Sequence, residues 1–104
     1  MTRGDVYRIR IPSGRGRDQR GPRYGVIVQA DALLGLSTAI IAPTSRSAAP
    51  ATFRPEVVVA GTVTRVLAEQ VRAVDLHRLS EQVGRLAAHE QQAVDEALEL
   101  VLGL

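Results

Sequence analysis

The sequence predicts a mainly β domain of the α+β class, in which an antiparallel, barrel-like sheet precedes one C-terminal amphipathic helix. About five or six short apolar or alternating segments are separated by closely spaced turn signals, with no long helix between them, which disfavours a parallel βαβ fold. From Ala87 onward, the apolar residues instead recur with the period of a helix. The length of 104 residues suits a single domain, 1–104, around one core.

The first half of the chain contains three predicted strands. Residues 5–11 alternate, with tyrosine and isoleucine on one face and arginine on the other, so we expect a half-exposed strand in which Val6 is out of phase. Residues 25–28 form a short β-branched run, which predicts a buried strand. Residues 37–42 predict a third strand, and we expect Pro43 to stop it.

The second half contains the remaining strands and the helix. Residues 56–59, 63–67 and 70–74 predict strands, the last two being separated at Ala68-Glu69. Residues 46–55 contain two prolines and several small residues, which predicts a mobile surface loop. The helix is expected to bury Val94, Ala97, Leu98, Val101 and Leu102, to expose Glu90, Gln91, Asp95, Glu96 and Glu99, and to stop at Gly103.

Composition excludes several classes of protein. There is no cysteine, which excludes disulfides and thiolate metal sites. No apolar run approaches the roughly 18 residues of a membrane span, and the N-terminus is too charged for a secretory signal. We therefore expect a soluble, cytoplasmic protein with no membrane partner.

The charge is polarised along the chain. All 13 basic residues are arginine, with no lysine and no asparagine, which is typical of a GC-rich genome. Residues 1–30 hold seven arginines against two aspartates, whereas residues 80–104 hold one arginine against five acidic residues. A positive end of this kind favours a polyanion, either RNA, DNA or an acidic protein segment.

The sequence lacks the motifs of the common classes of enzyme. The glycine-rich stretch precedes a strand instead of following one, and no Gly-Lys-Ser/Thr occurs, so nucleotide-binding loops are excluded. The two histidines, His77 and His89, have no acidic partners at ligand spacing, so we expect exposed positions and no metal site. A catalytic triad is also poorly supported. Catalysis without cofactor or metal would have to use Arg, Thr, Ser, Gln, Glu or Asp.

Residues 14–31 are the predicted working region of the chain. They join an arginine-dense loop, punctuated by glycine, directly to the predicted strand 25–28. Arg23 and Tyr24 stand at the mouth of that strand, where a side chain is both anchored and exposed. Thr44 and Ser45 follow the end of the next predicted strand, where hydroxyl groups either face a pocket or satisfy the backbone.

The order of several motifs is that of a known family. The motifs are Arg3-Gly4-Asp5-Val6-Tyr7, the glycine-rich loop leading to Arg23 and the strand end V-I-V-Q-A-D, Pro43-Thr44-Ser45, the run 68–75, Arg78-Leu79, and the run 83–86. In this order, over nearly the whole chain, the sequence resembles the MazF/PemK (Kid) toxins, which are mRNA interferases of type II toxin-antitoxin systems.

The resemblance implies a fold and an activity. It implies an SH3-like β-barrel with a C-terminal helix, acting as a homodimer that cleaves single-stranded mRNA without metal. The 2′-hydroxyl would attack the phosphate, leaving 2′,3′-cyclic phosphate and 5′-hydroxyl ends. A cognate antitoxin would block the toxin by laying an acidic, disordered C-terminal segment over the arginines of the loop.

The resemblance also assigns residues. Arg23 matches the family's strand-mouth arginine and is the candidate for charge stabilisation and proton transfer, although a guanidinium is a poor base. Thr44 matches the hydroxyl that would hold a phosphate oxygen. Residues expected to bind RNA or to orient Arg23 are Arg15, Arg17, Asp18, Gln19, Arg20, Glu69 and Gln70.

The chain departs from the family at one position, and two alternatives stay open. The family usually has Arg-Pro where this chain has Arg23-Tyr24, with Pro22 one position earlier, which leaves the loop geometry and the level of activity open. One alternative is a protein of this fold that binds nucleic acid or antitoxin without cleaving. The other is a CcdB-type gyrase poison, although that family relies on a tryptophan near its C-terminus and this chain has none.

Overall fold

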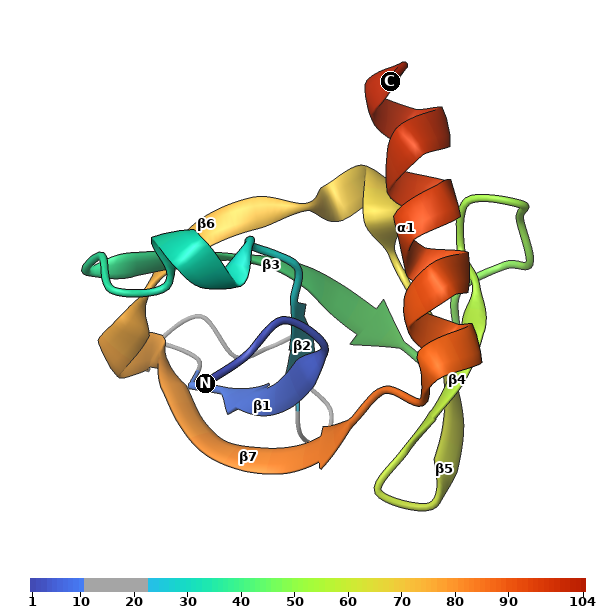
Figure 1. Cartoon of the computed structure of the whole chain (residues 1–104). Helices are drawn as coiled ribbons and strands as arrows, with labels where there is room; N and C mark the ends of the chain where they lie inside the picture. The colour runs from blue at the N-terminus through green and yellow to red at the C-terminus, as the bar shows by residue number, and fades with distance from the viewer. Residues whose placement is uncertain (11–22) are drawn as a thin grey trace.

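The computed structural model describes residues 1–10 and 23–104, and these residues form a curled antiparallel sheet that carries a C-terminal helix (Figure 1). Its elements are β1 (Asp5–Ile9), β2 (Arg23–Ile27), β3 (Thr38–Ser45), β4 (Glu56–Val59), β5 (Thr62–Val66), β6 (Arg72–Asp75), β7 (Leu79–Arg85) and α1 (Ala88–Leu102), with short 3-10 turns at Asp31–Leu33, Ala68–Gln70 and Leu76–Arg78. The strand order is β4-β5-β3-β2-β1-β7, and β6 pairs with β3 outside this path. The predicted fold class, a mainly β domain with an antiparallel, barrel-like sheet and a C-terminal helix, is confirmed, and the observed sheet is a curled half-barrel.

Strand β3 organises the sheet because it changes partners along its length. Its first residues pair with β6, its middle pairs with β2 as far as Gly25 opposite Pro43, and its last two residues pair with β5. The prediction that Pro43 stops this strand was wrong. Pro43 forms the last pair between β3 and β2, so its missing N–H does not interrupt hydrogen bonds further along these two strands. Its carbonyl oxygen still accepts a hydrogen bond from the Leu67 N–H at 2.8 Å.

The buried side chains form two clusters on opposite faces of the curled sheet. One lies between the sheet and α1 and contains Val6, Val26, Val66 and Val94 among others. The second lies inside the curl and includes Ile9 and residues of β2, β3, β6 and β7. In β1 the predicted alternation holds, because Tyr7 and Ile9 belong to the second cluster and Arg8 is exposed. Val6 is out of phase, as predicted, but it is fully buried in the first cluster, so β1 buries side chains on both faces.

Two further expectations differ from the structure. The sequence did not predict strand β7. Its residues look like a polar connection, and Leu79 is the one residue of the strand that is buried. It forms by pairing with β1, with two register shifts. On α1, Val94, Ala97 and Leu98 are buried as predicted, but Leu102 is exposed. The predicted stop at Gly103 is confirmed, with φ of 71°.

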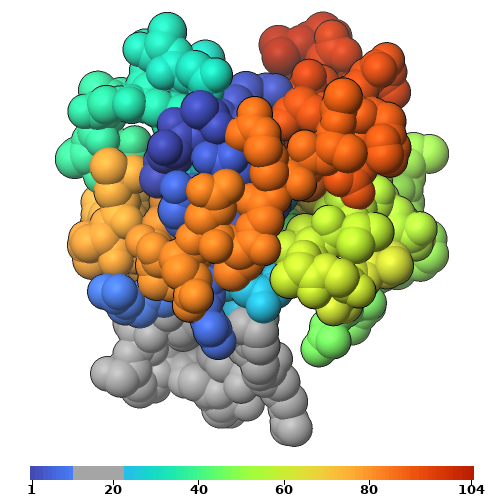
Figure 2. All heavy atoms as spheres, turned by 60° about the horizontal axis from the view of Figure 1, so that its bottom comes forward, coloured from blue at the N-terminus to red at the C-terminus, as the bar shows by residue number. Residues whose placement is uncertain are grey.

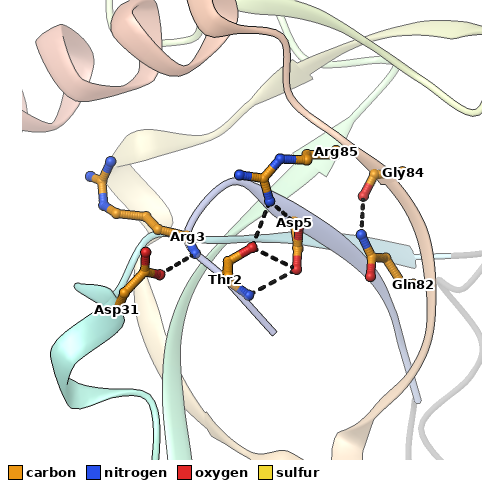
Figure 3. Close-up of polar contacts among 7 residues, drawn as sticks. All are labelled: Thr2, Arg3, Asp5, Asp31, Gln82, Gly84 and Arg85. Carbon is orange, nitrogen blue, oxygen red and sulfur yellow. Dashed lines mark hydrogen bonds and ion pairs between the residues drawn. The ribbon is translucent and has the colours of Figure 1, made fainter.

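The N-terminal Arg3-Gly4-Asp5 turn is tied into the fold by ionic hydrogen bonds (Figure 3). Asp5, only 4% exposed, accepts from the Thr2 backbone N–H at 2.8 Å and from Arg85 at 2.5 Å. The Arg3 backbone N–H donates to Asp31, and the Arg3 guanidinium pairs with Asp95 of α1 at 2.7 Å. Burial alone would raise the pKa of Asp5, but the hydrogen bonds from Thr2 and Arg85 outweigh it and the pKa lies below its ordinary value.

Asp5→Asn should therefore reduce stability and also flatten its dependence on pH. A lowered folded-state pKa gives stabilisation that is present above the unfolded value of about 3.9 and is lost as pH falls through the folded value. At pH 7 we expect the substitution to lower the free energy of unfolding by about 2 kcal/mol, which is typical of a hydrogen bond to a charged group. The difference in stability between wild type and variant should disappear as the pH falls below about 4. Urea unfolding at a series of pH values measures this. The exposed Asp75→Asn is the control, and parallel pH profiles for Asp5→Asn and wild type would contradict the assignment.

Candidate functional site

A cavity of about 620 Å³ lies where the start of β2, the end of β3 and the β4–β5 hairpin meet. It is lined by Arg23 and Tyr24 at the start of β2, by Thr44 to Ser47 at and after the end of β3, and by Val59, Ala60, Thr62 and Thr64 of the β4–β5 hairpin. Figure 2 shows the start of β2, in cyan, reaching the surface beside this hairpin, in yellow-green. The volume falls within the range of about 300–1,000 Å³ that is usual for ligand sites.

The change of partner in β3 opens this cavity. Strands β2 and β3 pair only as far as Gly25 and Pro43, and Thr44 then pairs with Val66 of β5. Tyr24 and Thr44 come next along the two separating strands, and both line the cavity. Strand pairing thus places Arg23 and Thr44, which are distant in sequence, at one opening.

The chemistry of the lining suits a polyanion. Arg23 and Arg46 are exposed cations, and Thr44, Ser45, Ser47, Thr62 and Thr64 supply hydroxyl groups that both donate and accept hydrogen bonds. The Thr64 hydroxyl is buried and has no hydrogen-bond partner among the residues that the structure describes.

The hairpin contributes one unusual backbone conformation to the lining. Val59 and Thr62 are the last pair of β4 and β5, so Ala60 and Gly61 form a two-residue turn. Both have positive φ, 51° for Ala60 and 79° for Gly61, as a type I′ turn requires. This conformation is uncommon for alanine, and Ala60 itself lines the cavity.

The structure brings together only some of the predicted site residues. Arg23 and Thr44 line the same cavity. Glu69 and Gln70 do not line it and lie in the 3-10 turn Ala68–Gln70. Arg15, Arg17, Asp18, Gln19 and Arg20 lie outside the described residues.

Glu69 is engaged elsewhere. One of its carboxylate oxygens accepts from the Nε and Nη2 atoms of Arg54, at 2.9 and 2.6 Å. These hydrogen bonds from Arg54 outweigh burial and hold the pKa of Glu69 below its ordinary value, which makes this carboxylate a weaker base. Arg54 also donates to the Ala49 carbonyl, so the pair ties the loop 46–55, predicted to be mobile, to the turn at Ala68–Gln70.

Sequence reasoning missed Arg46, Ser47, Thr62 and Thr64 as lining residues. Arg46 had been placed at the start of a surface loop, and Thr62 and Thr64 alternate along a strand that carries no recognisable motif. The closeness of Arg46 to the motif Pro43-Thr44-Ser45 was the one available signal.

The described residues contain neither a metal-binding cluster nor a membrane-spanning helix. Within residues 1–10 and 23–104, no three His, Asp or Glu side chains are grouped closely enough to hold a metal ion. His77 and His89 are both exposed, as predicted. In the same two ranges, no helix is long and apolar enough to cross a membrane.

Comparisons with known sequences agree with the predicted resemblance. A model of the PemK-like, MazF-like toxins of type II toxin-antitoxin systems matches residues 2–102. Over 106 residues, covering 100% of this chain and 99% of the relative, the chain is 38% identical to the provisionally named toxin Rv3098A of Mycobacterium tuberculosis. Over 111 residues, covering 100% and 92%, it is 31% identical to the endoribonuclease MazF of Staphylococcus saprophyticus.

Solved structures share the fold. A mycobacterial endoribonuclease in complex with its cognate antitoxin superimposes with a TM-score of 0.83 at 18% identity, covering 100% of this chain and 96% of that one. MazF from Deinococcus radiodurans gives 0.77 at 24% identity, covering 100% and 97%. Since the family model spans nearly the whole chain and the curled sheet with its terminal helix recurs in these toxins, the chain belongs to the PemK-like, MazF-like toxin family of type II toxin-antitoxin systems.

Proposed function

We propose that this chain is a sequence-selective endoribonuclease that cleaves single-stranded RNA without a metal ion, and so acts on mRNA as the toxin of a toxin-antitoxin pair. One observation carries the proposal: Arg23 and Thr44, on two different strands, line a single cavity together with the exposed Arg46. Relatives that match this chain over its full length are named endoribonuclease MazF, which supports the same activity.

The proposed reaction uses the nucleophile that RNA itself carries. The 2′-hydroxyl oxygen forms a bond to the adjacent phosphorus as the bond from phosphorus to the 5′-oxygen breaks. The 2′-hydroxyl loses its proton and the departing 5′-oxygen gains one, so the products carry a 2′,3′-cyclic phosphate and a 5′-hydroxyl. We assign Arg23 to stabilise the charge that develops on the phosphate and to assist proton transfer. Thr44 would donate a hydrogen bond to a phosphate oxygen and hold the in-line geometry.

Cleavage of single-stranded RNA tests this proposal directly. The purified protein should cut RNA equally well with and without EDTA, and the fragments should carry 2′,3′-cyclic phosphate and 5′-hydroxyl ends. RNA with deoxyribose at the cleaved nucleotide should survive, because the nucleophile is missing. Loss of cleavage in EDTA, or equal cleavage of the deoxy-substituted RNA, would contradict the mechanism. RNA that is bound but never cut would favour a non-cleaving binding protein.

We also propose two protein partners. One is a second copy of the chain, since a small core benefits from shared burial, and the other is a cognate antitoxin with an acidic, disordered C-terminal segment. The second partner is supported by the mycobacterial endoribonuclease of the same fold, which was solved in complex with its cognate antitoxin. The acidic segment would compete with RNA for Arg23 and for Arg15, Arg17 and Arg20, which lie outside the described residues. Cleavage of mRNA would place the protein in the cytoplasm.

A further inference from the structure

Tyr24 is an aromatic side chain held at the edge of the cavity. It is half-buried, it packs against the core cluster between the sheet and α1, and it also lines the cavity beside Arg23. Tyr24 and Val26 lie on the same face of β2, so the packing of that strand fixes the direction of the ring. A tyrosine ring has few rotamers, and packing against the core reduces them further, so little freedom remains to be lost on binding.

The surroundings of the ring suit a nucleobase. Arg23 and Tyr24 line the same cavity, so a nucleotide whose phosphate is held by Arg23 would bring a neighbouring base within reach of the ring. The remaining wall is rich in hydroxyl groups, of which Ser47 and Thr62 are exposed and can meet the polar edge of a base. Proteins recognise single-stranded RNA by stacking unpaired bases on aromatic rings and by hydrogen-bonding their edges.

We infer that Tyr24 is the stacking platform for the base of a nucleotide next to the cleaved bond, and that it helps to set which sequences are cut. This inference rests on the proposed function and adds the recognition element of the same site. The RNA sequences that are cut should therefore depend on this contact between Tyr24 and a base.

A double-mutant cycle between protein and RNA tests the contact. The wild-type protein is first given a single-stranded RNA pool with a random segment, and the cleaved ends are sequenced. The probe is then a short RNA of the preferred sequence with deoxyribose at the cut nucleotide, so that binding is measured without cleavage. Variants of this probe lack the base at each position around the cut.

Tyr24→Leu should weaken binding of the intact probe about 5- to 150-fold, the loss typical of one stacked base. Removing one particular base should weaken binding to the wild type by a similar factor, and combining the two changes should add little, because both remove the same contact. Leucine retains apolar packing against the core, and Tyr24→Phe, which retains the ring, should bind like wild type. Tyr7→Leu, at the other half-buried tyrosine, which packs in the second core cluster, should not change binding.

The outcomes separate this inference from the proposed function. If wild type cuts RNA but Tyr24→Leu binds the probe as tightly as Tyr24→Phe, the stacking role is wrong and the nuclease stands. If the fold losses in affinity from Tyr24→Leu and from base removal multiply at every position of the probe, the two changes are independent. The ring then contacts no base, and the inference is again wrong. If the wild type neither cuts nor binds RNA, the proposed function falls and takes this inference with it.

Discussion

Replacing Arg23 by alanine is expected to reduce the rate of RNA cleavage about 100- to 1000-fold, the loss typical of removing one electrostatic stabiliser of a transition state. The guanidinium offers a fork of hydrogen bonds that matches phosphate oxygens, and in the proposed mechanism it opposes the charge that builds up during attack. Arg23→Lys keeps the charge but loses the fork, so its loss should be intermediate. Thr44→Ala should lose less than Arg23→Ala, since it removes one neutral hydrogen bond.

Single-turnover cleavage of one RNA by each variant measures these rates, with folding verified by urea unfolding. The matched control is Arg8→Ala. Arg8 is an exposed arginine on the neighbouring strand β1, lies opposite Tyr24 in the ladder, and does not line the cavity. Its loss should leave the rate nearly unchanged. A cleavage rate for Arg23→Ala within threefold of the Arg8→Ala rate would remove Arg23 from the mechanism.

The largest effect on stability is expected from Glu90→Ala, which should lower the free energy of unfolding by about 2 to 4 kcal/mol. Glu90 was predicted on the exposed face of the helix, and this was wrong: it is 8% exposed. One carboxylate oxygen accepts the Ala87 N–H at 2.8 Å, which caps the start of α1, and the other accepts the Val58 N–H of β4 at 2.8 Å. Alanine would leave both backbone donors without this partner and would untie the helix from the edge of the sheet.

Urea denaturation of Glu90→Ala and Glu90→Gln, beside wild type, tests this role. The amide of glutamine keeps one acceptor oxygen but turns its NH2 group toward the other backbone N–H, so Glu90→Gln keeps one of the two hydrogen bonds and should also lose stability. The control is Glu96→Ala, an exposed glutamate of the same helix, which should stay within about 0.5 kcal/mol of wild type. Equal losses for Glu90→Ala and Glu96→Ala would show that the two bonds to Glu90 contribute nothing.

Local pattern predicted the elements of this fold that depend on local sequence. The strand at 56–59 coincides with β4, and the residues of the buried strand 25–28 and of the helical stripe around Val94 are largely those that the structure buries. Arg23 and Thr44 were found through the order of their motifs, and both line the cavity, although their catalytic roles stay predictions. Glu69 was expected to bind RNA or to orient Arg23, but it pairs with Arg54 of the loop 46–55 and does not line the cavity.

The sequence by itself determined the class of fold, the family and two residues that line the cavity, because these follow from the periodicity of side chains and from the order of motifs along the chain. Only the tertiary structure decided that β3 runs through Pro43, that Glu90 is buried, and that Tyr24 shares a cavity with the hairpin residue Thr62. Each of these depends on which strand lies beside which. Pairing of that kind joins residues that are far apart along the chain, and a change of partner midway along a strand leaves no periodic signal in the residues that it brings together.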